Sequence, residues 1–103
     1  MDKKERLEVY AAATAKFGET SQIAIAIEEM GELIVALTQG HFRGRGKKSA
    51  IVEELADVYV VLEQLFQKYG EEEIWEVIDF KVRRLSARVN GPEEPEAMCC
   101  DRF

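Results

Sequence analysis

Four glycines divide the 103-residue chain into stretches that each repeat apolar residues with the period of an α-helix. A glycine directly after the last turn is a common helix stop signal. Between these glycines we find no segment with the strict apolar–polar alternation of a half-buried strand. The glycines are Gly18, Gly40, Gly70 and Gly91. The sequence therefore predicts an all-α fold of four helices, over residues 3–17, 20–39, 49–69 and 71–89.

Composition indicates one folded domain over residues 1–90, since 47% of the chain is hydrophobic and 33% is charged. Residues 91–103 are polar and carry two prolines, so we expect a disordered tail in which Cys99 and Cys100 are free thiols. No apolar run approaches the roughly 20 residues that span a bilayer, and no signal-peptide core follows the N-terminus. We therefore expect a cytoplasmic protein with no membrane contact. The net charge of −6 argues against nucleic-acid binding.

Two acidic clusters stand inside otherwise apolar helical sequence, at residues 28–32 (EEMGE) and 53–57 (EELAD). Acidic pairs on a helix usually form a solvated face, because Glu is rarely buried. At about 100° per residue, however, Glu54 falls on the apolar side of the third helix, with Asp57 beside it. Glu53 falls on the polar side of this helix, which Glu63 shares. The sequence thus separates Glu54 and Asp57 from the water-facing acids of the same helix.

The second helix gives a similar separation. Its main apolar stripe is formed by Ile23, Ile27, Met30, Ile34 and Leu37. Glu29 and Glu32 lie roughly opposite that stripe, on a side that also carries other apolar residues. This predicts a helix buried on two sides, with Glu29 and Glu32 on the second one. Glu28 lies further round the helix.

The four selected carboxylates could be neutralised by protonation, by basic partners or by a metal ion. Glu29 and Glu32 are spaced i, i+3, as are Glu54 and Asp57. Oxygen-only ligands suit Mg²⁺ or Mn²⁺ and not Zn²⁺. A di-iron carboxylate bundle would need a Glu-x-x-His pattern, which is lacking. We interpret the clusters as halves of one divalent-metal site, with a structural acid cluster as the alternative.

Basic residues occur in two places. The fourth helix carries Lys81, Arg84 and Arg88 beside its apolar stripe, where they could bind phosphate oxygens or pair with the excess acid. Residues 40–48 form a basic, glycine-rich connection that does not match a phosphate-binding P-loop. We interpret this connection as a lid or substrate clamp whose His41 and Arg43 could contact the substrate.

The acidic pattern, Glu-Glu-x-x-Glu followed after a spacer by Glu-x-x-Asp, resembles the MazG-like all-α nucleoside triphosphate pyrophosphohydrolases. The resemblance covers roughly residues 20–90 and implies Mg²⁺-dependent hydrolysis of an NTP or dNTP to the monophosphate and pyrophosphate, with clearance of non-standard nucleotides as one role. It also implies a homodimer or homotetramer whose chains together complete the helical bundle. Some relatives carry Asn where this chain has Arg84. By position, the resemblance assigns the metal to Glu29, Glu32, Glu54 and Asp57, catalysis to Glu28 or Glu32, and phosphate binding to Lys81, Arg84 and Arg88.

The residues alone leave other functions open. A non-catalytic helical interaction or regulatory module could keep the acidic clusters, and a nucleotide or metal sensor would bind without turnover. Helices 20–39 and 49–69 are apolar on more than one side, which favours oligomerisation independently of the resemblance. The base and sugar, the number of metal ions and the choice between dimer and tetramer stay open.

Overall fold

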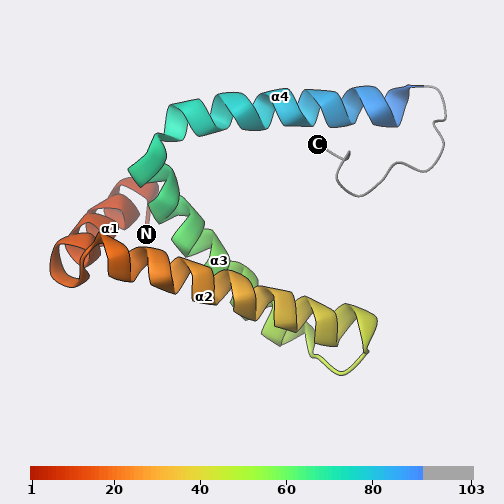
Figure 1. Ribbon diagram of the computed structural model, residues 1–103, viewed down its shortest axis with the longest axis horizontal. Coiled ribbons are helices and arrows are strands. Elements are labelled where there is room, and N and C mark those ends of the chain that lie inside the picture. The colour runs from red at the N-terminus through yellow and green to blue at the C-terminus, as the bar shows by residue number, and fades with distance from the viewer. Residues whose placement is uncertain (92–103) are drawn as a thin grey trace. The chain divides into compact units, whose positions relative to one another are not determined.

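The computed structural model describes residues 1–91, and all regular secondary structure in this part of the chain is helical, without a strand (Figure 1). The predicted all-α class and the four helices are confirmed. The expectations for residues 92–103, including Cys99 and Cys100, lie outside the described residues. No helix among residues 1–91 combines the length and the apolar character needed to cross a membrane. The helices are α1 (Lys3–Phe17), α2 (Glu19–Leu37), α3 (Lys48–Tyr69) and α4 (Glu71–Asn90), with a π-helical turn η1 (Thr38–Phe42) after α2.

The chain divides into two compact units. The first, Met1–Lys68, contains α1, α2 and nearly all of α3, and the second begins at Tyr69 and contains α4. Within the first unit, α2 and α3 run in opposite directions on either side of the connection at residues 43–47 (Figure 1). The assignment of residues 1–90 to a single domain stays a prediction.

Two of the four glycines that divide the sequence into helices adopt the left-handed backbone conformation that favours glycine. Gly18 has φ 89°, and its N–H caps α1 by donating to the Thr14 carbonyl at 2.9 Å. Gly70 has φ 103° between α3 and α4. Gly40, in contrast, lies inside the turn η1. The backbone at Gly46 packs directly against it, since a Cβ on Gly46 would lie 2.9 Å from the Gly40 Cα. Gly40 therefore serves a close backbone approach and does not end a helix.

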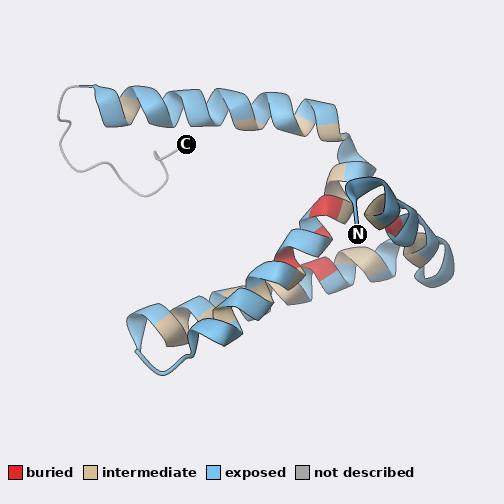
Figure 2. Ribbon diagram, turned by 180° about the vertical axis from the view of Figure 1, so that it is seen from behind, coloured by how far each residue is buried: buried red, intermediate tan, exposed pale blue. Residues whose placement is uncertain are grey.

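The buried core is small, and its residues lie on α1, α2 and α3 (Figure 2). Its apolar members are Tyr10, Ala26, Val58 and Val61. The apolar stripe predicted for the second helix is mostly outside this core: Ile27 is 65% exposed and Ile34 is 66% exposed. The reason is that α2 turns Ala26, Glu29 and Leu33 inward instead.

Glu63 corrects a second expectation. The helical pattern placed it on the water face of the third helix, but the side chain is buried and only 8% exposed. Its carboxylate accepts hydrogen bonds from Arg6 Nε at 2.7 Å and from the Tyr10 hydroxyl at 2.7 Å. The helix α1 covers this side of α3, and its Arg6 guanidinium neutralises the buried Glu63 carboxylate. On α3 alone, water would have to solvate this carboxylate.

Candidate metal centre

The structure brings together the four carboxylates that the sequence selected. One oxygen from each of Glu29, Glu32, Glu54 and Asp57 lies within 4.8 Å of the others. We call these residues the acid quartet. Two come from α2 and two from the antiparallel α3, and the i, i+3 spacing sets each pair on one wall of its helix. The prediction that carboxylates of the two acidic clusters lie close together is therefore confirmed.

Burial differs within the acid quartet. Glu32 is exposed, whereas Glu29, Glu54 and Asp57 are half-buried. The Oε2 atoms of Glu29 and Glu54 are fully buried and accept no hydrogen bond from any of residues 1–91. A buried carboxylate oxygen without a partner loses its hydration and gains nothing in return. Protonation, an ordered water or a cation would satisfy these two oxygens.

The electrostatics of the acid quartet are unfavourable for four negative charges. Burial raises the pKa of Glu29, and the negative charges of Glu32 and Asp57 raise it further. Burial and the same two neighbours also raise the pKa of Glu54. Within the described part of the chain, no Lys, Arg or His forms an ion pair with the acid quartet. A divalent cation would offset both the cost of burying these carboxylates and the repulsion between their negative charges. A set of oxygen donors alone fits Mg²⁺ or Mn²⁺.

An open hollow adjoins the acid quartet at the connection end of α2. Glu28 is exposed and lines it together with Glu32 and Glu54, and small residues form much of the remaining wall. Gly31 is one of these, and a Cβ built on it would meet no atom within 4 Å. No other helix of the described residues therefore approaches closely at Gly31. Glu53 is exposed, as predicted.

The three predicted phosphate-binding cations lie on α4, in the second unit. Lys81 is exposed and Arg88 is half-buried. Arg84 is exposed and places its guanidinium 5.9 Å from the ring centre of Phe80. Their contact with phosphate stays a prediction.

The predicted loop contacts lie near the end of the turn η1. His41 and Arg43 are both exposed, and the His41 ring meets Phe42 edge to face at 4.8 Å. The Arg43 N–H donates to the Thr38 carbonyl at 3.2 Å. The side chains of His41 and Arg43 are thus accessible to a ligand, and their substrate contact stays a prediction.

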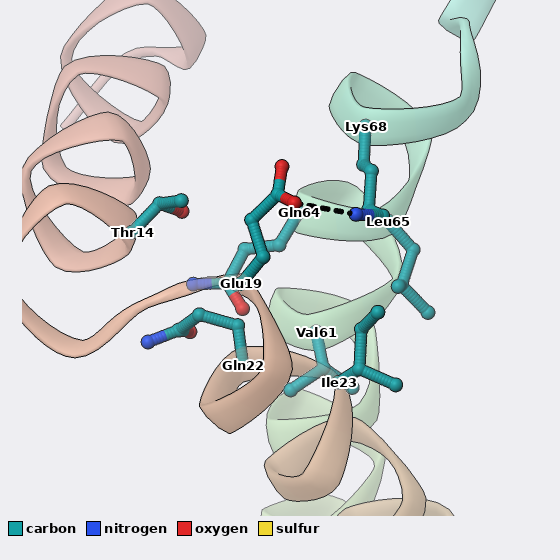
Figure 3. Close-up of a pocket in the computed structure, with 8 residues that line it drawn as sticks. All are labelled: Thr14, Glu19, Gln22, Ile23, Val61, Gln64, Leu65 and Lys68. Atoms are coloured by element: carbon teal, nitrogen blue, oxygen red, sulfur yellow. Dashed lines mark ion pairs between the residues drawn. The ribbon is translucent and has the colours of Figure 1, made fainter.

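Sequence reasoning missed a cavity between α1, α2 and α3, which carries two glutamine side chains, Gln22 and Gln64 (Figure 3). Gln22 stands seven residues before Glu29, and Gln64 stands seven residues after Asp57. Seven residues are two helical turns, so both glutamines lie on the helix faces that carry the acid quartet. This spacing is the signal that could have identified them.

Comparison of the chain with protein-family models, with curated proteins and with solved structures finds no match in any of the three.

Proposed function

We propose that this protein is a divalent-metal-dependent nucleoside triphosphate pyrophosphohydrolase of the MazG-like type. The observation that carries the proposal is the acid quartet, whose four oxygens from two antiparallel helices lie within 4.8 Å of one another. The resemblance of the two acidic motifs to that family supports the same function. The two unpartnered oxygens of Glu29 and Glu54 support the need for a cation.

Glu29, Glu32, Glu54 and Asp57 would hold Mg²⁺, or Mn²⁺ in its place. When bound, the metal supplies positive charge to the triphosphate and makes an attacking water more acidic. Glu29 and Glu54 are half-buried and would hold the metal from the inner side, whereas the exposed Glu32 would face the substrate.

The reaction is attack of water on the α-phosphorus of the nucleotide. A new P–O bond forms to the water oxygen, the bond between the α-phosphorus and the bridging oxygen breaks, and pyrophosphate leaves. Glu28 or Glu32 accepts the proton that the water loses. Both line the open hollow beside the acid quartet, so both can reach a water there. Glu28 stands outside the acid quartet, which favours it as the base.

Lys81, Arg84 and Arg88 would contact the phosphates. Arg offers two parallel donors to phosphate oxygens and Lys offers a point charge. The three positive charges would offset the charge of a triphosphate that the acidic protein otherwise repels.

A homodimer or homotetramer belongs to the proposal, because large apolar side chains stay exposed on the single chain. Ile27 and Ile34 of α2 are about two-thirds exposed, and Val82 and Val89 of α4 are 57% and 74% exposed. Exposed apolar surface of this extent is typical of an interaction face. A second copy offers the same faces with the same apolar character.

The experiment is a pyrophosphate-release assay with purified protein, Mg²⁺ or Mn²⁺, and a panel of standard and modified NTPs and dNTPs. We expect release from at least one nucleotide, no release after addition of EDTA, and a loss of at least about a hundredfold in Glu54→Gln. Glu53→Gln is the matched control, since its carboxylate is exposed one residue away. Absence of release from the whole panel, or full activity in Glu54→Gln, would contradict the proposal.

The exposed apolar faces also favour a second candidate, a helical interaction module that binds a partner without catalysis. It predicts that Glu54→Gln leaves partner binding intact and that Mg²⁺ does not raise the melting temperature. A nucleotide sensor would instead bind a non-hydrolysable NTP analogue in calorimetry and release no pyrophosphate from the matching NTP.

A further inference from the structure

The acidic residues of this chain leave one long gap. All 20 Asp and Glu residues lie outside residues 33–52, whereas four of the 14 Lys and Arg residues lie inside this segment. The segment contains the turn η1 and the connection from α2 to α3. The net charge of −6 averages over this separation, so it does not describe the charge that a partner meets here. We call the exposed end of the α2–α3 pair the basic tip; its members are Phe42, Arg43, Arg45, Lys47 and Lys48.

The charges of the basic tip are exposed and unpaired. Residues 41–50 are all exposed, and Figure 2 shows the connection between α2 and α3 in the colour of exposed residues. Within residues 1–91, none of the four cations of the basic tip forms an ion pair, although the chain is rich in acids. Glu32 and Glu53, the nearest acids in sequence, are separated from the basic tip by at least about 8 Å of helix axis. This is about one screening length at physiological salt, so these acids offset the local positive charge only weakly.

The backbone of the basic tip is held in one shape by hydrogen bonds to the end of the preceding helical segment. The Arg43 N–H donates to the Thr38 carbonyl at 3.2 Å. The Arg45 and Gly46 N–H groups both donate to the Gln39 carbonyl, at 2.9 and 3.3 Å. A connection fixed in this way loses less conformational entropy on binding a ligand than a flexible loop does.

Phe42 places an aromatic ring among these cations. It is 81% exposed, more than any other Phe, Tyr or Trp among residues 1–91. The His41 ring meets it edge to face at 4.8 Å, and an exposed fraction of this size leaves a flat face of the Phe42 ring open. Proteins that bind single-stranded nucleic acid combine these two features, because a base stacks on the aromatic face while the cations bind the backbone phosphates. A double helix offers no such free base face, since its bases stack on one another.

We propose that the basic tip binds single-stranded nucleic acid, with one base stacked on Phe42 and the phosphates of the nucleic-acid backbone bound by the four cations. The two Arg offer paired donors to a phosphate, and the two Lys offer point charges. A nucleic-acid strand fits better than an anionic lipid surface, because one large apolar side chain gives little area to insert into a bilayer. The inference goes beyond the proposed function and does not rest on the acid quartet.

The test is the fluorescence anisotropy of labelled oligonucleotides of about twelve residues, one of DNA and one of RNA, titrated with the protein in EDTA without NTP. We expect a Kd on the order of 10⁻⁵ to 10⁻⁴ M at about 100 mM salt for at least one of them. The tighter oligonucleotide identifies which nucleic acid is the partner. The logarithm of the association constant should fall with the logarithm of the salt concentration, with a slope of up to about −2.8 for four phosphates.

Two variants separate stacking from charge. Phe42→Leu keeps an apolar side chain without the ring, so affinity should fall about tenfold while the salt slope stays unchanged. An oligonucleotide without bases should bind Phe42→Leu and the wild type equally. The double variant Arg45→Gln, Lys47→Gln should reduce the magnitude of the salt slope by about 1.4. Phe17→Leu is the matched control, because Phe17 is also exposed, at 58%, and lies beside a lysine on α1; it should change neither quantity.

Three results would overturn the inference. The first is an unchanged anisotropy up to about millimolar protein, well above the Kd expected for such contacts. The second is wild-type affinity in Phe42→Leu, which would show that no base stacks on the ring. The third is displacement of the oligonucleotide by a stoichiometric amount of NTP, which would assign the basic tip to the substrate. Sedimentation with phosphatidylserine vesicles in the absence of oligonucleotide binding would likewise overturn it in favour of a lipid surface.

Discussion

Glu63 accepts hydrogen bonds from both Nε and Nη2 of Arg6, at 2.7 and 3.1 Å, across a separation of 57 residues. The Tyr10 hydroxyl donates to the same carboxylate at 2.7 Å. This network ties α1 to α3 on the side of α3 that the sequence assigned to water. Because α1 also forms one wall of the cavity with Gln22 and Gln64, the network holds that wall in place.

Glu63→Gln is expected to lower the free energy of unfolding by about 2 kcal/mol. The amide keeps the shape of the carboxylate but loses the charge that pairs with Arg6. Chemical denaturation followed by circular dichroism measures the change. The control is Asp79→Asn, since Asp79 pairs with Arg83 at 2.7 Å while both side chains are more than 60% exposed. An exposed pair contributes at most about 0.5 kcal/mol, so equal losses in the two variants would contradict the assignment.

The same carboxylate predicts a loss of stability in acid. The hydrogen bonds from Arg6, with those from Tyr10, lower the pKa of Glu63 to about 2, from an ordinary value of 4.5. Above the ordinary value the stabilisation is fully present, because Glu63 is ionised in both the folded and the unfolded chain. Between the two values the unfolded chain binds a proton that the folded chain does not, so stability falls as the pH falls. Melting temperatures between pH 6 and pH 2 should show this fall, and Glu63→Gln should reduce its slope; an unchanged slope would argue against it.

The helices and the acid quartet could be predicted because both depend on spacing within one helix. The 3.6-residue period sets which residues share a face, and the i, i+3 acids follow from it. The period does not tell which face another helix will cover. Glu63 was assigned to water because its neighbour, α1, is remote in sequence. The apolar stripe with Ile27 and Ile34 was assigned to the core because it is apolar, but no other helix of the described residues covers it, and both side chains are exposed.

Removing one charge from the acid quartet should stabilise the metal-free protein. In Glu54→Gln a neutral amide replaces a half-buried carboxylate that faces the negative charges of Glu32 and Asp57. We expect a higher melting temperature in EDTA and a smaller rise on addition of Mg²⁺ than in the wild type. Glu53→Gln should match the wild type in both conditions. A Glu54→Gln protein that melts lower in EDTA and keeps the full Mg²⁺ effect would show that the acid quartet holds no cation.

Ile34→Lys tests whether the exposed stripe of α2 is an interface. Ile34 is 66% exposed, so the substitution should change the stability of the single chain by no more than about 0.5 kcal/mol. In an oligomer it would bury an unpaired ammonium, and we expect the mass measured by light scattering to fall to that of one chain. Val9→Lys is the control, because Val9 is also exposed, at 51%, but lies on α1. An unaltered mass in Ile34→Lys would place the interface elsewhere.

Gly31→Ala should raise stability and lower activity together. A glycine in mid-helix costs about 1 kcal/mol relative to alanine, and an added Cβ meets nothing within 4 Å. The free energy of unfolding is therefore expected to increase by up to about 1 kcal/mol. The new methyl would stand in the hollow that Glu28 and Glu32 line beside the acid quartet. A substrate that approaches the backbone there would lose contact, so kcat/KM for pyrophosphate release should fall.

Ala24→Gly supplies the opposite change at an exposed position of the same helix, remote from the hollow. It should cost about 1 kcal/mol of stability and leave kcat/KM unchanged. The pair of variants separates helix propensity from the space beside the acid quartet, because propensity alone would move stability without moving activity. If Gly31→Ala raises stability and keeps full kcat/KM, the space at Gly31 serves neither the substrate nor its entry, and the hollow is an ordinary surface depression.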